Sequence, residues 1–128
     1  METPLAAIAL TLKDYFDGLY ESDTRKLARA FHPKATYACA TEGKLLHLSM
    51  PEYFPVVDKR PAPASRNEPR RDEIVSVTLA GPVTAFVHAR CAIGPKHFTD
   101  FLTLVQVDGR WQILSKVFHF DLLPGAGA

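Results

Sequence analysis

Residues 98–119 read FTDFLTLVQVDGRWQILSKVFH, and this stretch decides the fold of the chain. Its Asp108-Gly109 pair stands between two alternating apolar runs, which is the strongest short signal for a β-hairpin with a two-residue turn. Such a turn fixes the strand register, so Val117 is expected opposite Asp100. Asp100 and His119 then share one sheet face as diagonal neighbours, among mostly apolar side chains. We expect a ligand site there.

Four antiparallel strands are predicted along the second half of the chain. Alternating apolar residues define the strands, and Gly-Pro or Asp-Gly turns separate them. The predicted strands cover residues 74–80, 83–93, 98–107 and 110–122. Together they form a meander, a sheet in which each strand pairs with the next.

Three helices are expected in the first half of the chain. Thr3 is the predicted N-cap of the first helix, whose apolar stripe continues to about Tyr20. Asp23 is positioned to cap a short second helix. Ser49 begins a capping box for the third helix, which Pro55 should shorten or kink.

The remaining segments are a small hairpin, a loop and a tail. Residues 35–41 and 44–48 are predicted as two short strands, and the proline-rich residues 60–71 as a solvated loop. Residues 124–128 are predicted to be a flexible tail. Helices followed by an antiparallel meander indicate an α+β protein, with one domain spanning residues 1–128.

Composition narrows the function classes. The 128 residues include 15 basic and 14 acidic side chains, a formal charge of +1 that offers no argument for nucleic acid or an anionic membrane. The two cysteines, Cys39 and Cys91, lie far apart and are expected to be free thiols, without metal-ligand spacing. The N-terminus predicts neither a signal peptide nor a membrane span, so a cytoplasmic location is the default.

Signature motifs of several enzyme classes are missing. The sequence contains no glycine-rich phosphate loop, no His-Glu-x-x-His and no Gly-x-Ser-x-Gly. Nucleotide-dependent enzymes, zinc hydrolases and α/β-hydrolases are therefore disfavoured, and neither a metal nor a cofactor is inferred.

The predicted pairing gives the sheet two faces. Small and apolar residues dominate the face that holds Asp100 and His119, so we assign that face to the concave side under the helices. Mixed aromatic and polar residues on the other face suit a dimer surface, and we expect two chains to join through Phe101, Leu114 and Phe118. A β-bulge in either hairpin would reverse the assignment downstream of it. The basic residues His88, Arg90 and Lys116 would then line the pocket and favour an anionic ligand.

Asp100 and His119 have the chemistry for proton transfer. Asp100 could act as a base, with His119 as the acid or orienting group. Alternatively, the two residues tie the core together, because buried charges need partners. Further side chains are candidates for ligand contacts because they lie on helices facing the sheet, at the exit of the second helix or on the apolar sheet face: Tyr15, Tyr20, His32, Tyr53, Phe54 and Trp111.

The chain resembles the nuclear-transport-factor-like superfamily, which includes ketosteroid isomerases and SnoaL-type polyketide cyclases. Its closest likeness is to a bacterial group called putative lumazine-binding proteins. The residues that carry the resemblance are FHPKA at 31–35, FTDFLTL at 98–104, DGRWQI at 108–113 and KVFH at 116–119.

The resemblance implies a cone-shaped half-barrel, in which three N-terminal helices pack on a curved, mainly antiparallel sheet. It also implies a homodimer with an apolar pocket in each cone. In the isomerases and cyclases, acidic and histidine side chains in that pocket move protons at carbon next to a carbonyl. Asp100 and His119 are comparable in chemical type and expected direction.

Three functions fit the sequence. The first is a protein that binds a small apolar or aromatic molecule. The second is a cofactor-free isomerase, cyclase or dehydratase that uses Asp100 and His119 for proton transfer. The third is a dimeric, non-catalytic adaptor, which would require a filled cone and an exposed apolar patch.

Overall fold

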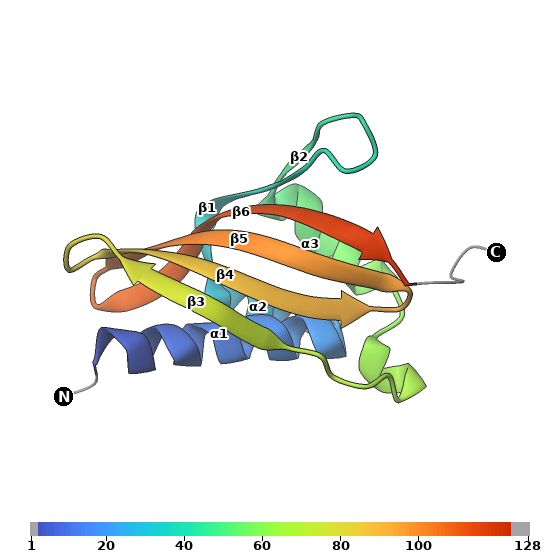
Figure 1. Ribbon diagram of the computed structural model, residues 1–128, viewed down its shortest axis with the longest axis horizontal. Coiled ribbons are helices and arrows are strands. Elements are labelled where there is room, and N and C mark those ends of the chain that lie inside the picture. The colour runs from blue at the N-terminus through green and yellow to red at the C-terminus, as the bar shows by residue number, and fades with distance from the viewer. Residues whose placement is uncertain (1–2, 124–128) are drawn as a thin grey trace.

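The computed structural model describes residues 3–123 and shows three helices packed on an unclosed six-stranded sheet (Figure 1). The strand order is β2-β1-β6-β5-β4-β3. All neighbouring pairs are antiparallel except β1 and β6, which are parallel. The elements are α1 (Pro4–Glu21), α2 (Thr24–Ala30), β1 (Phe31–Cys39), β2 (Leu46–Ser49), α3 (Met50–Lys59), the 3-10 turn η1 (Pro63–Arg66), β3 (Glu73–Leu79), β4 (Thr84–Ile93), β5 (Lys96–Val107) and β6 (Arg110–Leu122).

The helix caps follow the sequence signals. Thr3 accepts a hydrogen bond from the backbone of Ala6, and Asp23 caps α2. Ser49 and Glu52 form the complete capping box of α3. These caps satisfy backbone N–H groups that a helix leaves unpaired at its start, so the predicted helix starts are confirmed.

The first strand begins earlier than expected. Phe31 ends α2 and also opens β1, whereas the sequence placed the strand start at residue 35. The segment 60–71 is a connection that contains the short turn η1. The predicted tail at 124–128 lies outside the described residues. Among residues 3–123, no helix is both long and apolar enough to cross a membrane.

A β-bulge in β6 changes which side chains face the helices. Thr103 lies opposite Ser115 and Leu104 lies opposite Ile113, so Leu114 has no partner in β5. Burial follows the shift, because Ile113 is buried and the next buried side chain of β6 is Lys116. The expected register is therefore correct up to Ile113 and wrong beyond it.

The helix-covered face of β4 and β5 matches the prediction. Inward residues such as Ala89 and Leu102 are fully buried, whereas Phe101 on the other face is 48% exposed. Downstream of the bulge, Lys116 and Phe118 take the inward positions that had been assigned to Ser115 and Val117. The core therefore contains a lysine that the predicted register had placed on the outside.

Candidate functional site

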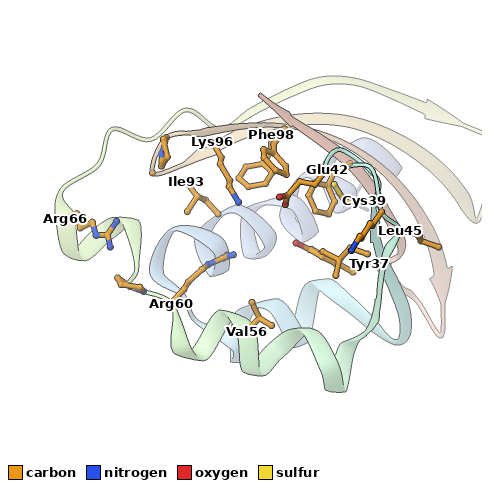
Figure 2. Close-up of a pocket in the computed structure, with 17 residues that line it drawn as sticks. Tyr37, Cys39, Glu42, Leu45, Val56, Arg60, Arg66, Ile93, Lys96 and Phe98 are labelled. Carbon is orange, nitrogen blue, oxygen red and sulfur yellow. The ribbon is translucent and has the colours of Figure 1, made fainter. Parts of the chain in front are cut away.

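A cavity of about 820 Å³ opens at one end of the half-barrel (Figure 2). Four parts of the chain surround it: the β1–β2 hairpin, the end of α3 with the following loop, the β4–β5 turn, and the last residues of β6. Its lining residues are Tyr37, Cys39, Glu42, Lys44, Leu45, Leu46, Val56, Arg60, Pro61, Arg66, Ile93, Gly94, Pro95, Lys96, Phe98, Phe118 and Phe120. This volume lies within the usual range for small-molecule sites.

Aromatic rings form one wall of the cavity. Phe98 comes from β5, and Phe118 and Phe120 come from β6, where the bulge has turned both inward. The ring centroids of Phe98 and Phe118 are 5.7 Å apart, and those of Tyr37 on β1 and Phe118 are 4.8 Å apart. A wall of this kind offers flat apolar area to a ring or hydrocarbon chain.

Charged side chains also line the cavity. The lining contains four cationic residues and one acidic residue, Glu42. Figure 2 shows Arg60, Lys96 and Glu42 directed into the same space from different elements. Val56 and Arg60 lie one turn apart at the end of α3, so one side of the helix supplies both an apolar and a cationic contact.

Deeper along the same sheet face lies a buried polar cluster centred on Asp100. The Tyr15 hydroxyl donates a hydrogen bond of 2.5 Å to Asp100 Oδ2. Lys116 Nζ lies 3.9 Å from Asp100 Oδ1, and the Cys91 thiol lies 3.9 Å from Oδ2. The side chains of Asp100 and Lys116 are 0% and 4% exposed, so this is a buried ion pair.

Lys116 is surrounded by aromatic rings. Its Nζ lies 4.8 Å from the Phe118 ring centroid, 5.1 Å from that of Tyr15 and 5.3 Å from that of Tyr37. Ring faces attract a cation, and this attraction offsets part of the loss of hydration. Phe118 and Tyr37 also line the cavity, so the ammonium group lies directly behind the aromatic wall.

The cluster shifts the ionisation of its members. Burial is the largest single effect and would lower the pKa of Lys116, but the charge of Asp100, together with smaller contributions from Tyr53, Tyr37 and Cys91, raises that pKa above the ordinary lysine value. Burial, and next the charge of Asp100, raise the pKa of the Cys91 thiol to about 12. The same two causes raise the pKa of the Tyr15 hydroxyl well above its usual value. At neutral pH the lysine is therefore charged, whereas the thiol and the phenol are neutral.

The predicted pairing of Asp100 with His119 is wrong. Asp100 lies opposite Phe118, and His119 lies on the other face of the sheet because of the bulge at Leu114. The side chain of His119 is 56% exposed, and its ring nitrogens contact Thr41 and Asp121. Tyr15 and Lys116 occupy the neighbourhood of Asp100 instead.

The tyrosines predicted to contact a ligand lie in different places. Tyr53 is buried behind the cavity, where its ring stacks on Tyr37 at 4.2 Å. Tyr15 is also fully buried and does not reach the cavity surface. The Tyr20 hydroxyl donates to the backbone carbonyl of Glu68, outside the cavity. None of the three tyrosines therefore lines the cavity, and Tyr53 supports its wall by packing behind Tyr37.

The other predicted contacts lie away from the main cavity. His32 and Phe54 line a separate hollow of about 250 Å³ near the start of β1. Trp111 is buried near the opposite end of the sheet, where its carbonyl accepts a hydrogen bond from Thr11. Of the basic residues considered for a reversed face, only Lys116 turns inward, whereas Arg90 is exposed beside Glu73.

Sequence reasoning missed most of the cavity wall. Tyr37, Arg60 and Lys96 were not singled out, because the loops that bring them together leave no periodic signal. Phe118 and Lys116 were placed on the wrong face because one extra strand residue reverses the alternation. One feature of the sequence did indicate Lys116: it belongs to the three basic residues that would face the pocket if a strand carried a bulge.

Comparison with known proteins identifies the family. A family model described as "Putative lumazine-binding" matches residues 3–119. The chain belongs to this family. Its fold is that of nuclear-transport-factor-2-like proteins, as the resemblance predicted.

Two solved structures illustrate the fold match. An NTF-2-like protein of unknown function from Silicibacter pomeroyi is 28% identical, with a TM-score of 0.81 over 91% of this chain and 95% of that chain. An NTF2-like protein of unknown function from Shewanella baltica is 25% identical, with a TM-score of 0.82 over 94% and 98% of the two chains.

One relative has a name that indicates an activity. A protein named Aldolase FrzH, from Cladobotryum sp., is 27% identical over 115 residues, which is 88% of each chain. Family membership and the fold together support a ligand-binding protein.

Proposed function

We propose that this protein binds a small, mainly apolar or aromatic molecule in the cavity between α3 and the sheet. The observation that carries this proposal is the cavity of about 820 Å³ with Phe98, Phe118 and Phe120 in its wall. Large aromatic side chains normally pack against other side chains in a protein interior. A hollow bounded by several of them is therefore typical of a binding site. An open cone also favours ligand binding over the adaptor hypothesis, which required a filled one.

A neutral aromatic dye tests binding at this place. N-phenyl-1-naphthylamine should bind the wild-type protein with an increase in fluorescence. Val56→Trp places a large ring in the cavity, whereas Leu5→Trp adds the same ring at an exposed helix position outside it. We expect Val56→Trp to weaken dye binding by about tenfold or more, the loss of about 1.4 kcal/mol of contact, and Leu5→Trp to leave it unchanged. Equal binding by both variants would contradict the proposal.

A second candidate function is cofactor-free proton transfer at carbon next to a carbonyl. The observation that favours it is the buried pair of Asp100 and Lys116 directly behind the cavity wall. The aldolase name of one relative points in the same direction, because an aldol reaction begins with removal of such a proton. Asp100 would be the base, and the Lys116 ammonium would stabilise the negative charge that develops on the carbonyl oxygen.

This second function requires a movement. Phe98 and Phe118 line the cavity, while Asp100 and Lys116 are buried one inward position deeper on the same strands. A substrate therefore reaches the carboxylate only if one of these rings swings aside. Asp100 can contact a substrate, and so act as a catalytic residue, only while that ring is swung aside.

Deuterium exchange tests the proton-transfer proposal. The probe is 2-tetralone, an aromatic ketone, incubated in D2O and followed by NMR. Wild type should speed exchange at the carbon next to the carbonyl above the buffer rate, and so should Asp121→Asn, a change at an exposed acid of the same sheet. The double variant Asp100→Asn with Lys116→Met should lose the effect while still binding the neutral dye. Exchange at the buffer rate by the wild type would contradict the proposal.

A further inference from the structure

We infer that the natural ligand of the cavity is an organic carboxylate, with its apolar body on the aromatic wall and its carboxylate between Arg60 and Lys96. This inference rests on the proposed binding function and adds the chemical class of the ligand. It is carried by two cationic side chains that are directed into a hollow with an aromatic wall, one of which, Arg60, has unpaired donors.

Arg60 is the strongest of these groups. It follows the last residue of α3 and is directed into the cavity, as Figure 2 shows. Its Nε and one terminal guanidinium nitrogen are buried and have no hydrogen-bond partner among the described residues. Buried donors are nearly always paired, because leaving one unpaired costs the free energy of its lost hydration. A guanidinium with two free donors is complementary to a carboxylate, which accepts two parallel hydrogen bonds, and a rotation of the Arg60 side chain would turn these buried donors toward the cavity.

Lys96 supplies a second cation from the other side of the cavity. It opens β5, and its Nζ lies 4.4 Å from the ring centroid of Phe120. That ring is part of the aromatic wall, so Lys96 connects the charged side of the cavity to the apolar side. A ligand that spans the two sides must therefore have an apolar body with a negative group at its edge.

The side chains that line the cavity carry a net positive charge, which also favours an anionic ligand. Lys44 and Arg66 add to the positive potential, although Arg66 also lies 3.8 Å from Glu68. Glu42 is the only acidic residue among those that line the cavity. Cations in a hollow with apolar walls attract anions more strongly than the same cations would on a flat surface, because the surrounding dielectric is lower.

A matched pair of probes separates charge from shape. 2-Naphthoate and 2-naphthamide have the same ring system and nearly the same size, but only the first carries a charge. Each is titrated against protein loaded with N-phenyl-1-naphthylamine, and displacement of the dye gives the affinity of the probe. We expect naphthoate to bind about tenfold more tightly than naphthamide, because hydrogen bonds to a charged group contribute more to the binding free energy than hydrogen bonds to a neutral one.

Three variants assign the preference to particular side chains. Arg60→Gln and Lys96→Gln should each weaken naphthoate several-fold and leave naphthamide unchanged, and Glu42→Gln should strengthen naphthoate. The control is Arg25→Gln, which removes a 90% exposed cation that does not line the cavity and should change neither affinity. Thermal melts check that each variant is folded, and two independent cation variants keep the test valid if one of them is not.

The outcomes distinguish the inference from the proposed function. If dye and naphthamide bind but naphthoate binds no more tightly than naphthamide, the carboxylate inference is overturned and the binding function stands. A naphthoate preference that survives in both Arg60→Gln and Lys96→Gln overturns the inference as well. If the dye does not bind the cavity, the proposed function itself fails.

Discussion

Lys116 carries a positive charge into the interior of the protein, where Asp100 is its carboxylate partner. The ion pair is fully enclosed, and aromatic rings fill the rest of the space around the ammonium. Moving two charges out of water costs several kcal/mol per ion, and the pair repays this cost only while both members are present. Each member is therefore sensitive to loss of the other, whatever the pair does for a ligand.

Asp100→Asn should destabilise the protein by about 3–5 kcal/mol, because it leaves Lys116 buried without its counter-charge. The double variant Asp100→Asn with Lys116→Met should recover most of this loss, since the charge is then replaced by an apolar side chain of similar length. Urea denaturation of the wild type, both single variants and the double variant measures the coupling. A loss below about 1 kcal/mol for Asp100→Asn, as expected of a surface substitution, would show that the ammonium does not depend on the carboxylate.

At the scale of elements, β6 determines which chemistry faces the cavity. This strand pairs with β5 on one side and with β1 on the other, and both ladders are irregular at the same level. The Gln112 amide donates to the backbone carbonyls of Arg29 and Phe31, which ties β6 to the junction of α2 and β1. Gln112 is buried between two buried apolar neighbours, so the alternation of β6 stops here and resumes with the opposite phase at Lys116.

Two single-residue deletions test this account of β6. Removing Leu114 takes out the unpaired bulge residue and keeps Lys116 opposite Leu102. Removing Val117 shifts Phe118 and Phe120 to the outer face, because the side-chain period of a strand is two residues. We expect the Leu114 deletion to have a higher free energy of unfolding than the Val117 deletion. The Val117 deletion should also lose dye binding. The reverse order in a denaturation series would contradict the bulge assignment.

At the scale of the whole molecule, the sheet has an outer face that none of the three helices covers (Figure 1). Phe86, Phe101 and Val117 lie on it with 41%, 48% and 51% of their surface exposed, and the rings of Phe86 and Phe101 are 5.5 Å apart. The sequence predicted a dimer through Phe101, Leu114 and Phe118. Phe118 is buried on the helix side, so Val117 replaces it on this outer face.

We propose that two chains associate through this outer face. Light scattering at micromolar concentration should give twice the 14.2 kDa mass of one chain. Phe101→Glu should shift the protein toward the monomer, because a carboxylate in the centre of an interface would lose its hydration. Leu5→Glu places the same charge at an exposed position of α1 and should leave the dimer intact. A wild-type monomer at these concentrations would rule out the proposed association.

Much of the fold followed from local sequence signals. Thr3, Asp23 and Ser49 start helices because their side chains bond the nearest backbone N–H groups. Asp108-Gly109 makes the turn of the β5–β6 hairpin, where both residues have positive φ, as the sequence predicted. The inward positions of β4 and β5 follow from alternation alone. Each of these features depends on residues only a few positions apart.

The cavity and its chemistry depended on contacts between distant parts of the chain. The bulge at Leu114 lies beside the start of β1, some eighty residues earlier, and it decides that Lys116 rather than His119 shares a face with Asp100. Arg60 and Lys96 meet at one cavity because a helix end and a strand start converge there. Alternation determines only that neighbouring residues of a strand face opposite ways, so one bulge is enough to reverse every side chain that follows it in the strand.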